Sequence, residues 1–552
     1  MSYERTKIVD GSIFAELVNA GVACLNENAK TVNDLNVFPI PDGDTGDNML
    51  HTISGGLKAM NAADERDIGA KARALADGML LNARGNSGVI LSQLFAGLAK
   101  GLSDLEEANI KQFAAAFCEG VKTAYLSVVS PVEGTILTVA RESFESAADE
   151  VTDNTDLAEY FGVVLEEMKV SLENTPNLLA VLKEAGVIDS GGAGLYYIAE
   201  GMKRAVSGEK FDVDIHGASA LKNIDFSLFD ENSVMEFGYC TEFLLRLQTA
   251  KVDVESFSEK TVIDYLSTIG DSIVCFKTGS IIKAHVHTLK PYKALEFCQQ
   301  FGEFLTIKIE NMTLQHNETV KDELAFTKVE KARKKFGVVT VATGKGIIEM
   351  FKEFGADHVI DGGQGNNPSA EDFIKAFDDV NADHIFVLPN NGNIILTAKQ
   401  AARMYEKSDI RVIETKNIGD CYSALSMLDY SCDDADTIAA NLKSDTETVT
   451  TGMITKAIRD ASLNGVEIKK GNYIGFTDKT MYSSDQSAVK TFIALCEKLG
   501  IGEKNFLIVI HGATAKEEDK RLIKEYAEGL KNIEFYEIDG GQEVYDHILI
   551  IE

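Results

Sequence analysis

The stretch Asn36-Val37-Phe38-Pro39-Ile40-Pro41-Asp42-Gly43-Asp44-Thr45-Gly46-Asp47-Asn48-Met49 is the part of the chain from which its fold is best argued. Three carboxylates, those of Asp42, Asp44 and Asp47, fall within six residues, behind two prolines and between glycines. Prolines stiffen the approach, and glycines let the backbone turn where a side chain would clash. Like charges this close repel each other, so we expect a divalent cation, and hard oxygen ligands suit Mg²⁺ or Ca²⁺. The spacing is not that of an EF-hand, so we predict a different metal-binding loop, with a polar turn between two helices as the alternative.

Two further segments have the composition of phosphate-binding helix starts. Gly85-Asn86-Ser87-Gly88 precedes an apolar run with helical spacing, and Asp189-Ser190-Gly191-Gly192-Ala193-Gly194 has the same character. Helix N-termini offer free N–H groups and the positive end of the helix dipole, and glycines let a ligand approach the backbone closely. Each segment alone is also an ordinary helix start. Together the three segments predict a metal–nucleotide site made from loops at helix ends.

Taken together, these segments resemble the nucleotide-binding L subunit of dihydroxyacetone kinases. The matching residues are Pro41 to Gly46, Ala83 to Gly88 and Asp189 to Gly194. In that family a barrel of antiparallel helices holds ADP or ATP through two Mg²⁺ ions chelated by aspartates of the first loop. Across nearly all 552 residues the chain is similar to the ATP-binding subunit of the bacterial fatty acid kinases, in which such a domain precedes an α+β domain and a DegV-like α/β domain.

This resemblance implies roles for the residues of the first two segments. Asp42 and Asp44 match the catalytic aspartates that chelate Mg²⁺. The third metal ligand stays open between Asn36, which lies one residue out of register with an aspartate of the dihydroxyacetone kinases, and Asp47, which could face the metal or help to cap a helix. Arg84 is expected to stabilise charge during catalysis, with a surface or ion-pair role as the alternative.

The nucleotide itself is expected to contact residues from all three segments and from one further turn. The expected contacts are Thr45, Asn48, Asn86, Ser87 and Gly88 for the β- and γ-phosphates, and Thr135, Asp189 and Gly191 for the remainder of the nucleotide. Thr45 could instead cap a helix, which is compatible with phosphate binding.

The apolar pattern divides the chain into three regions. Residues 1–207 read as an all-helical ATP- and Mg²⁺-binding domain, with helical spacing at Ser12 to Leu25, Leu75 to Leu81, Val89 to Leu102, Ile110 to Val129, Thr135 to Ala148, Leu157 to Leu172 and Ala193 to Val206. Residues 215–325 mix strands and helices, which predicts a small α+β domain. From 336 to 552 short apolar strands alternate with helices, which predicts a parallel α/β layer.

A short internal repeat indicates a further division of this last region. Asp361-Gly362-Gly363-Gln364 recurs as Asp539-Gly540-Gly541-Gln542, each time after an expected strand. We therefore predict two similar halves, about 336–440 and 450–552, in a DegV-like domain that docks a partner protein.

The middle region carries a second candidate metal site. His285 and His287 alternate on one expected strand, so both imidazoles would lie on one face of the sheet, and Cys240 lies on another expected strand. One thiolate and two imidazoles suit tetrahedral Zn²⁺ with a fourth ligand such as Glu242. The kinase family has the same Tyr-Cys-Thr-Glu and His-Val-His-Thr segments in its middle domain. The alternative is a buried cysteine and an exposed strand with two histidines.

Composition limits the partners and the compartment. The formal net charge of −32 disfavours nucleic acid and anionic lipid headgroups as direct partners. The sequence has no apolar run of 18 residues or more, and its first residues lack the apolar core of a signal peptide, so we expect no membrane insertion. Eight scattered cysteines fit a reducing, cytoplasmic location.

The predicted activity follows from the resemblance. Dihydroxyacetone kinases bind their ketone through a histidine of a separate subunit, and this chain shows no counterpart. We therefore expect a kinase subunit that phosphorylates the carboxylate of a fatty acid presented by a separate DegV-type carrier protein, with ATP, two Mg²⁺ and a structural Zn²⁺ as cofactors and a homodimer as the assembly. The alternatives are a kinase for a small hydroxyketone and a non-catalytic, nucleotide-sensing regulator.

Overall fold

The computed structural model describes residues 3–35, 43–63, 67–128, 130–209, 239–254, 256–278, 280–311, 333–478 and 480–552. They fall into two compact units: Met1–Ile215 together with Ala332–Glu552 form one, and His216–Lys331 form the other. The multidomain architecture expected from the sequence, with a helical first region and mixed α/β regions after it, is confirmed. The sequence divides the chain into three regions, and the first and last of them belong to the same compact unit.

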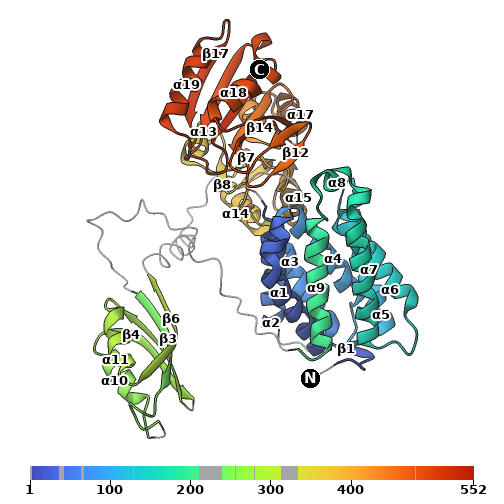
Figure 1. Ribbon diagram of the computed structural model, residues 1–552, viewed down its shortest axis with the longest axis vertical. Helices are drawn as coiled ribbons and strands as arrows, with labels where there is room; N and C mark the ends of the chain where they lie inside the picture. The colour runs from blue at the N-terminus through green and yellow to red at the C-terminus, as the bar shows by residue number, and fades with distance from the viewer. Residues whose placement is uncertain are drawn as a thin grey trace. The chain divides into compact units, whose positions relative to one another are not determined.

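The first region is a set of helices that closes on itself. The helices are α1 (Gly11–Asp34), α2 (Thr45–Ala62), α3 (Ile68–Asn82), α4 (Gly85–Gly101), α5 (Ile110–Ser127), α6 (Ile136–Glu150), α7 (Leu157–Leu178), α8 (Ala180–Ala185) and α9 (Ser190–Val206). From α1 to α7 each helix packs on the next, and α9 returns to α1, α6 and α7. Figure 1 shows α1 and α9 lying side by side along their length. Their inward faces share one apolar core, which includes Phe14, Phe113 and Phe161.

Local chemistry starts several of these helices. The Asp10 side chain accepts from the N–H of Ile13 at the start of α1, and Asn109 and Asp156 begin α5 and α7 with complete capping boxes. The region is not purely helical, because β1 (Ile8–Asp10) and β2 (Glu107–Asn109) pair as a short antiparallel ribbon. This ribbon ties the start of α1 to the start of α5.

In its described residues, the middle unit is an antiparallel sheet with two helices. Its strands are β3 (Tyr239–Leu247), β4 (Gly270–Thr278), β5 (Ile281–Thr288) and β6 (Gly302–Asn311), in the order β4-β5-β3-β6. The helices α10 (Lys260–Leu266) and α11 (Pro291–Gln299) cover one face, as the green part of Figure 1 shows. In the register of β3 and β5, Cys240 pairs with His287 and Glu242 pairs with His285.

The first half of the last region is the parallel layer that the sequence predicts. The strands β7 (Lys334–Ala342), β8 (His358–Asp361), β9 (Ala382–Leu388) and β10 (Asp409–Val412) are all parallel, in the order β10-β9-β7-β8. The helices of this half are α13 (Lys345–Glu353), α14 (Ala370–Val380), α15 (Ile395–Met404), α16 (Ile418–Ser426) and α17 (Ala435–Asp445). The strand order reverses at β7, and in such sheets ligands bind beyond the carboxyl ends of the strands at that point.

The second half has a different sheet from the first. It contains β11 (Thr450–Lys456), β14 (Tyr473–Thr477), β15 (Thr480–Asp485), β16 (Phe506–His511), β17 (Glu534–Asp539) and β18 (His547–Ile551), in the order β15-β14-β11-β18-β16-β17. In this sheet only β16 and β17 pair in parallel. A hairpin, β12 (Ala461–Leu463) and β13 (Val466–Ile468), a short 3-10 turn (Ile501–Glu503) and the helices α18 (Ala488–Lys498) and α19 (Glu517–Glu528) complete it. The two halves are therefore not equivalent, because β18 lies antiparallel between β11 and β16 in the second sheet, whereas every strand pair of the first sheet is parallel.

Within the first unit, the last region packs on the helices. The helix α15 lies against α4, and α14 lies against α3. Gln400 of α15 joins the two regions: its Nε2 donates to the carbonyl oxygen of Leu80 over 2.6 Å, and its Oε1 accepts from Nε2 of Gln93 over 3.2 Å. In the part of the chain that is described, no helix is both long and apolar enough to cross a membrane.

Candidate nucleotide site

Four helices of the first region begin close to one another. Ser190, the first residue of α9, donates its hydroxyl to that of Thr45, the first residue of α2, over 3.3 Å. The start of α4 joins them because the N–H of Arg84 donates to Oγ1 of Thr52, a buried residue of α2, over 3.2 Å. The start of α6 is equally near, since a Cβ on Gly191 would lie 3.2 Å from the Cβ of Ile136. Four positive helix ends thus face one place, which favours a bound anion such as a polyphosphate.

Asp44 lies at the N-cap position of α2 and faces this place. Its Oδ2 accepts a hydrogen bond of 2.6 Å from Nδ2 of Asn367 in the last region. Desolvation raises the pKa of the Asp44 carboxyl to about 6, partly offset by a hydrogen bond from the Asn48 side chain, while the nearby charge of Asp47 raises it further. The neighbouring groups do not fully offset the cost of burying the negative charge of Asp44. A bound cation would therefore stabilise the charged form of this carboxylate.

The capping alternative for Thr45 does not describe this helix start. Asp44 occupies the N-cap position, and its side chain makes no capping hydrogen bond. The free N–H groups are instead covered by Asn33 of α1, whose Oδ1 accepts from the N–H of Gly46 over 2.7 Å and from that of Asp47 over 3.3 Å. Asp47 lies in the first turn of α2 with an exposed side chain, and Asn48 is buried beneath it.

Asp189 caps α9 on the other side of the site. Its Oδ2 accepts from the N–H of Gly192 over 2.6 Å, and its own N–H donates to Oγ1 of Thr175 over 3.1 Å. Desolvation raises the pKa of the Asp189 carboxyl to about 6, against the lowering effect of hydrogen bonds from backbone N–H groups. Gly191 follows in the first turn, where a side chain would meet Ile136 of α6.

The start of α4 depends on its glycines. Gly85 has a φ of +58°, and a Cβ there would lie 2.6 Å from Nδ2 of Asn48. A Cβ on Gly88 would lie 2.3 Å from Oγ1 of Thr52. Asn86 and Ser87 lie between these two glycines in the first turn of the helix. The glycines therefore let α4 begin directly against α2.

The last region covers this side of the site through two loops. Arg84 donates from Nη1 to the carbonyl oxygen of Asn367 over 3.1 Å, and its backbone forms an isolated bridge with Ser369. Asn86 donates from Nδ2 to the carbonyl oxygen of Gly392 and to Oδ1 of Asn393, over 3.4 Å each. Arg84 and Asn86 are thus held at the contact between the two regions, beside the predicted phosphate position.

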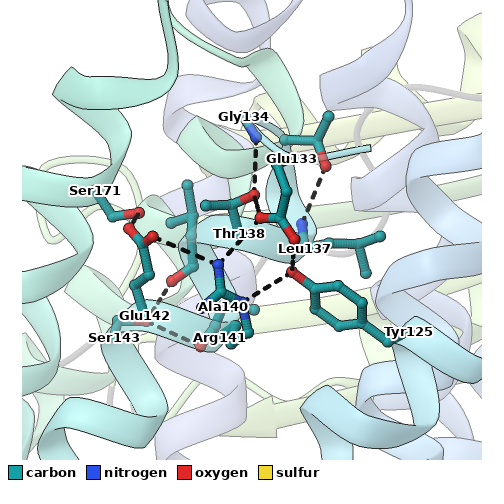
Figure 2. Close-up of polar contacts among 12 residues, drawn as sticks. Tyr125, Glu133, Gly134, Leu137, Thr138, Ala140, Arg141, Glu142, Ser143 and Ser171 are labelled. Carbon is teal, nitrogen blue, oxygen red and sulfur yellow. Dashed lines mark hydrogen bonds and ion pairs between the residues drawn. The ribbon is translucent and has the colours of Figure 1, made fainter. Parts of the chain in front are cut away.

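Thr135 lies at a loop held by a polar network. It is the N-cap residue of α6, and its hydroxyl accepts from the N–H of Leu137 over 3.4 Å. Figure 2 shows Glu133, Thr138, Arg141 and Tyr125 pointing toward one another behind this loop. Oε2 of Glu133 accepts from Oγ1 of Thr138 over 2.6 Å and from Nη2 of Arg141 over 3.1 Å.

This network orders the backbone that precedes α6. Oγ1 of Thr138 also accepts from the N–H of Gly134 over 2.8 Å, which fixes a residue with a φ of +85°. The hydrogen bond from Thr138, with that of Arg141, holds the pKa of the Glu133 carboxyl below its usual value. The Glu133 carboxylate therefore holds the loop through hydrogen bonds from three side chains.

A cavity of about 460 Å³ lies between the helix starts and the last region. Asp44, Thr45, Asp189 and Ser190 line its helical wall. Apolar side chains of the last region line another part: Val341, Ile347, Met453, Leu463, Phe476 and Ile548. Three buried polar atoms of lining residues have no hydrogen-bond partner among the described residues: Nδ2 of Asn391, Oγ1 of Thr451 and Oε1 of Gln542. The cavity thus has the mixed lining of a small-molecule site.

The two predicted metal sites are only partly within the described structure. Asn36 and Asp42 of the first loop lie outside the described residues, and so do the side chains of Cys240, His285 and His287. Within the ranges that are described, no three His, Cys, Asp or Glu side chains gather as a metal site would require. Two carboxylates of the first loop are described, that of Asp44 at the N-cap and that of Asp47 in the first turn of α2. Their oxygen atoms are hard ligands, which fit Mg²⁺.

Sequence reasoning missed two residues of the site, Asn33 and Asn367. Each touches the first loop from a distance along the chain, and Asn367 lies 323 residues from Asp44. The only local signal for Asn367 is its place in the turn-forming run Gly365-Asn366-Asn367-Pro368-Ser369, which is typical of any loop.

Comparison with known proteins identifies the chain by all three of its regions. A DAK2 domain matches residues 39–204, and the middle and C-terminal domains of FakA-like fatty acid kinase proteins match residues 236–319 and 337–552. Protein YloV of Bacillus subtilis is 39% identical over 559 residues, covering 99% of this chain and 100% of YloV. The chain belongs to the FakA-like fatty acid kinase family. The resemblance inferred from the three sequence segments is thereby confirmed, and the chain is a member of an ATP-dependent kinase family.

Other relatives of this kinase family extend the match. A Staphylococcus saprophyticus protein is 38% identical over 556 residues, covering 99% of each chain. Among solved structures, a fatty-acid-binding DegV family protein from Thermus thermophilus is 14% identical, covers 39% of this chain and 99% of its own, and has a TM-score of 0.29. The dihydroxyacetone kinase of C. freundii is 17% identical, covers 35% of this chain and 34% of its own, and has a TM-score of 0.26. TM-scores this low do not establish a shared fold.

Proposed function

We propose that this chain is the kinase subunit that transfers the γ-phosphate of ATP to the carboxylate of a fatty acid, which a separate DegV-type carrier protein presents. The observation that carries the proposal is the meeting of four helix N-termini around the carboxylates of Asp44 and Asp189. This arrangement offers donors and positive dipole ends for phosphates and oxygen ligands for the accompanying cation, and membership of the family supports the acceptor.

The chemistry asks for positioning and charge neutralisation, not for a protein nucleophile. An oxygen of the fatty acid carboxylate forms a bond to the γ-phosphorus, the bond from that phosphorus to the β,γ-bridging oxygen breaks, and ADP leaves with the electron pair. The product is an acyl phosphate, and no proton has to be moved. Bound Mg²⁺ would neutralise charge on the β- and γ-phosphates, with Asp42, Asp44 and either Asp47 or Asn36 as its protein ligands.

The remaining residues of the site take supporting roles in this proposal. The hydroxyl groups of Thr45 and Ser190 and the residues Asn86 to Gly88 contact the phosphates, and Asn48 and Thr135 lie beside them. Asp189 and Gly191 line the nucleotide farther from the transferred phosphate. Arg84, held at the start of α4, neutralises charge at the reacting end.

The other two regions serve assembly in this proposal. The last region docks the carrier protein, and the middle unit holds Zn²⁺ and forms a homodimer. Support for the dimer comes from β6, an edge strand whose Leu305, Ile307 and Ile309 side chains are all exposed. An exposed apolar edge strand is a ready site for association.

The test uses the full chain, γ-labelled ATP, Mg²⁺ and a DegV-type carrier loaded with a fatty acid. We expect label in a hydroxylamine-sensitive acyl phosphate, and its loss in the double variant Asp42→Ala/Asp44→Ala. Phosphorylation of dihydroxyacetone without a carrier would instead support the hydroxyketone kinase. Tight ATP binding with no transfer to either acceptor would support the nucleotide-sensing regulator.

A further inference from the structure

The loop between β8 and α14 brings one amide into direct contact with the metal-binding loop. Asn367 is only 2% exposed, and its Nδ2 donates to Oδ2 of Asp44 over 2.6 Å. The other end of the same amide, Oδ1, is buried and has no hydrogen-bond partner among the described residues. A buried amide oxygen without a donor is costly, so Oδ1 of Asn367, beside the Asp44 carboxylate, is available to a group bound there.

The backbone on both sides of Asn367 is firmly held. Before it, Gly363 and Asn366 exchange two backbone hydrogen bonds of 3.0 and 3.2 Å. After it, Ser369 caps α14 with a complete capping box. Arg84 donates to the carbonyl oxygen of Asn367 itself. The backbone position of Asn367 is therefore set by the fold.

Rotation of that amide by half a turn exchanges its donor for its acceptor. In the structure, the amide N–H of Asn367 donates to Oδ2 of Asp44. A cation bound to Asp44 would repel the NH₂ group and attract the carbonyl oxygen, which is a hard ligand suited to Mg²⁺. Neighbouring ligands of an octahedral Mg²⁺ lie about 2.9 Å apart, given metal–oxygen distances of about 2.0–2.1 Å. The 2.6 Å between the Asn367 amide and the Asp44 carboxylate is close to that separation.

We propose that Asn367 turns its Oδ1 to the metal held by Asp44, either directly or through one metal-bound water, so that the last region of the chain completes the metal site of the helical region. This inference rests on the proposed function, because it takes the first loop to hold Mg²⁺. Metal binding at Asp44 and docking of the loop 363–369 on the start of α2 are then coupled. Metal binding favours docking of the loop, and docking favours metal binding by the same factor.

The test measures metal affinity and not catalysis. Mn²⁺ replaces Mg²⁺, and the loss of its free electron paramagnetic resonance signal is followed during titration of the full chain without ATP. We expect Asn367→Ala to weaken Mn²⁺ binding about tenfold or more, in the range found when partners of metal sites are removed. Asn367→Asp, which restores an oxygen ligand, should bind within about threefold of the wild type. The matched control is Asn366→Ala, because Asn366 is the exposed neighbouring asparagine.

The sign of the effect separates a ligand from a competitor. If Asn367 only competes with the metal for the Asp44 carboxylate, Asn367→Ala will bind Mn²⁺ as tightly as the wild type or more tightly, and that result overturns the inference. Asn367→Ser serves as a second truncation if the alanine variant does not fold. If wild-type binding depends on Asp44 but not on Asn367, only this inference fails. If the wild type binds Mn²⁺ no better than Asp44→Ala does, the metal loop of the proposed function fails with it.

Discussion

The hydroxyl oxygens of Ser190 and Thr45 lie 3.3 Å apart, although the two residues are separated by 145 positions in the chain. This contact joins the first residues of α9 and α2, so the positive ends of two helices act on the same volume. With the starts of α4 and α6 beside them, the positive ends of four helices lie near one place.

Substitution of Gly88 should damage the start of α4. In Gly88→Ala the new Cβ would lie 2.3 Å from Oγ1 of Thr52, the fully buried hydroxyl that holds the N–H of Arg84. We expect the free energy of unfolding to fall by about 1–3 kcal/mol, as for other overpacked sites, and ATP affinity to fall with it. Urea denaturation and calorimetric titration with ATP would measure the two effects.

The matched control for that variant is Gly162→Ala. Gly162 lies within α7, and a Cβ there would have no neighbour within 4 Å. The substitution should raise the free energy of unfolding by about 0.5–1 kcal/mol, because alanine favours the helix over glycine. A Gly88→Ala variant as stable as this control would show that the contact with Thr52 is unimportant.

Asp44→Asn should make the protein more stable while it loses metal-dependent ATP binding. The pKa of the Asp44 carboxyl is raised to about 6, so its charged form is disfavoured by the fold at neutral pH. A neutral amide removes this penalty and can still accept from Asn367, so we expect a gain of about 1–2 kcal/mol, the value of one to two pKa units allowing for partial solvent screening. Thermal unfolding with and without Mg²⁺ and ATP tests both effects. If Asp44→Asn is less stable than the wild type, burial does not disfavour the charged form of Asp44 as inferred here.

The buried pair His511 and His547 should make stability depend on pH. Their Nδ1 atoms lie 2.9 Å apart, and His547 is fully buried. Desolvation, with the charge of His511 and Lys520, lowers the pKa of His547 from its ordinary value of 6.5 to about 3. The unfolded chain therefore binds this proton first, and stability falls as pH drops from about 6.5 toward 3, by up to about 1.4 kcal/mol per unit.

The raised pKa values of Asp44 and Asp189 act in the opposite direction, because the folded state takes up their protons first. The test is therefore the difference between the wild type and His547→Gln in urea unfolding at pH 7.5 and pH 5.5. We expect the wild type to lose more stability than the variant between these two pH values. Equal losses would show that His547 does not titrate between the folded and unfolded states.

Removal of zinc should destabilise the middle unit alone. The register of β3 and β5 pairs Cys240 with His287, which is the backbone arrangement that a site shared by these strands requires. We expect one zinc ion per chain by elemental analysis, its loss in Cys240→Ser, and its retention in Cys432→Ser, which replaces an exposed cysteine of another region. Chelation should lower the unfolding temperature of the middle unit without changing ATP affinity. A wild-type chain purified without zinc, and unable to take it up, would contradict this site.

Helix α2 illustrates where local sequence was not enough. Residues 45–62 are absent from the helices that apolar spacing predicts, and they contain Gly46, Gly55 and Gly56, which disfavour a helix. The structure shows why the glycines are there: a Cβ on Gly56 would lie 2.3 Å from Cγ of Met79 in α3, and one on Gly46 would lie 2.3 Å from the carbonyl oxygen of Ala29 in α1. Close packing against two neighbours stabilises a helix whose own propensity is low.

In the last region, local sequence was likewise not enough to predict how the strands of one sheet pair. Apolar strands alternating with helices correctly predict the parallel sheet of β7 to β10. The same pattern did not predict the mixed sheet of the second half, where β18 lies antiparallel between β11 and β16. Strand direction there depends on which distant strands pair, and the local pattern of apolar residues is the same for either direction.

The sequence by itself determined the helical first region, the parallel layer and the family. These follow from short-range properties: apolar spacing, glycine-rich helix starts and a run of acids, each readable within about ten residues. Only the tertiary structure decided which helix starts meet, which carboxylates lose solvent, and that Asn367 reaches Asp44. The physical reason is that desolvation and side-chain hydrogen bonds depend on distance in space, and packing of the last region on the helices brings together residues that the chain keeps 323 positions apart.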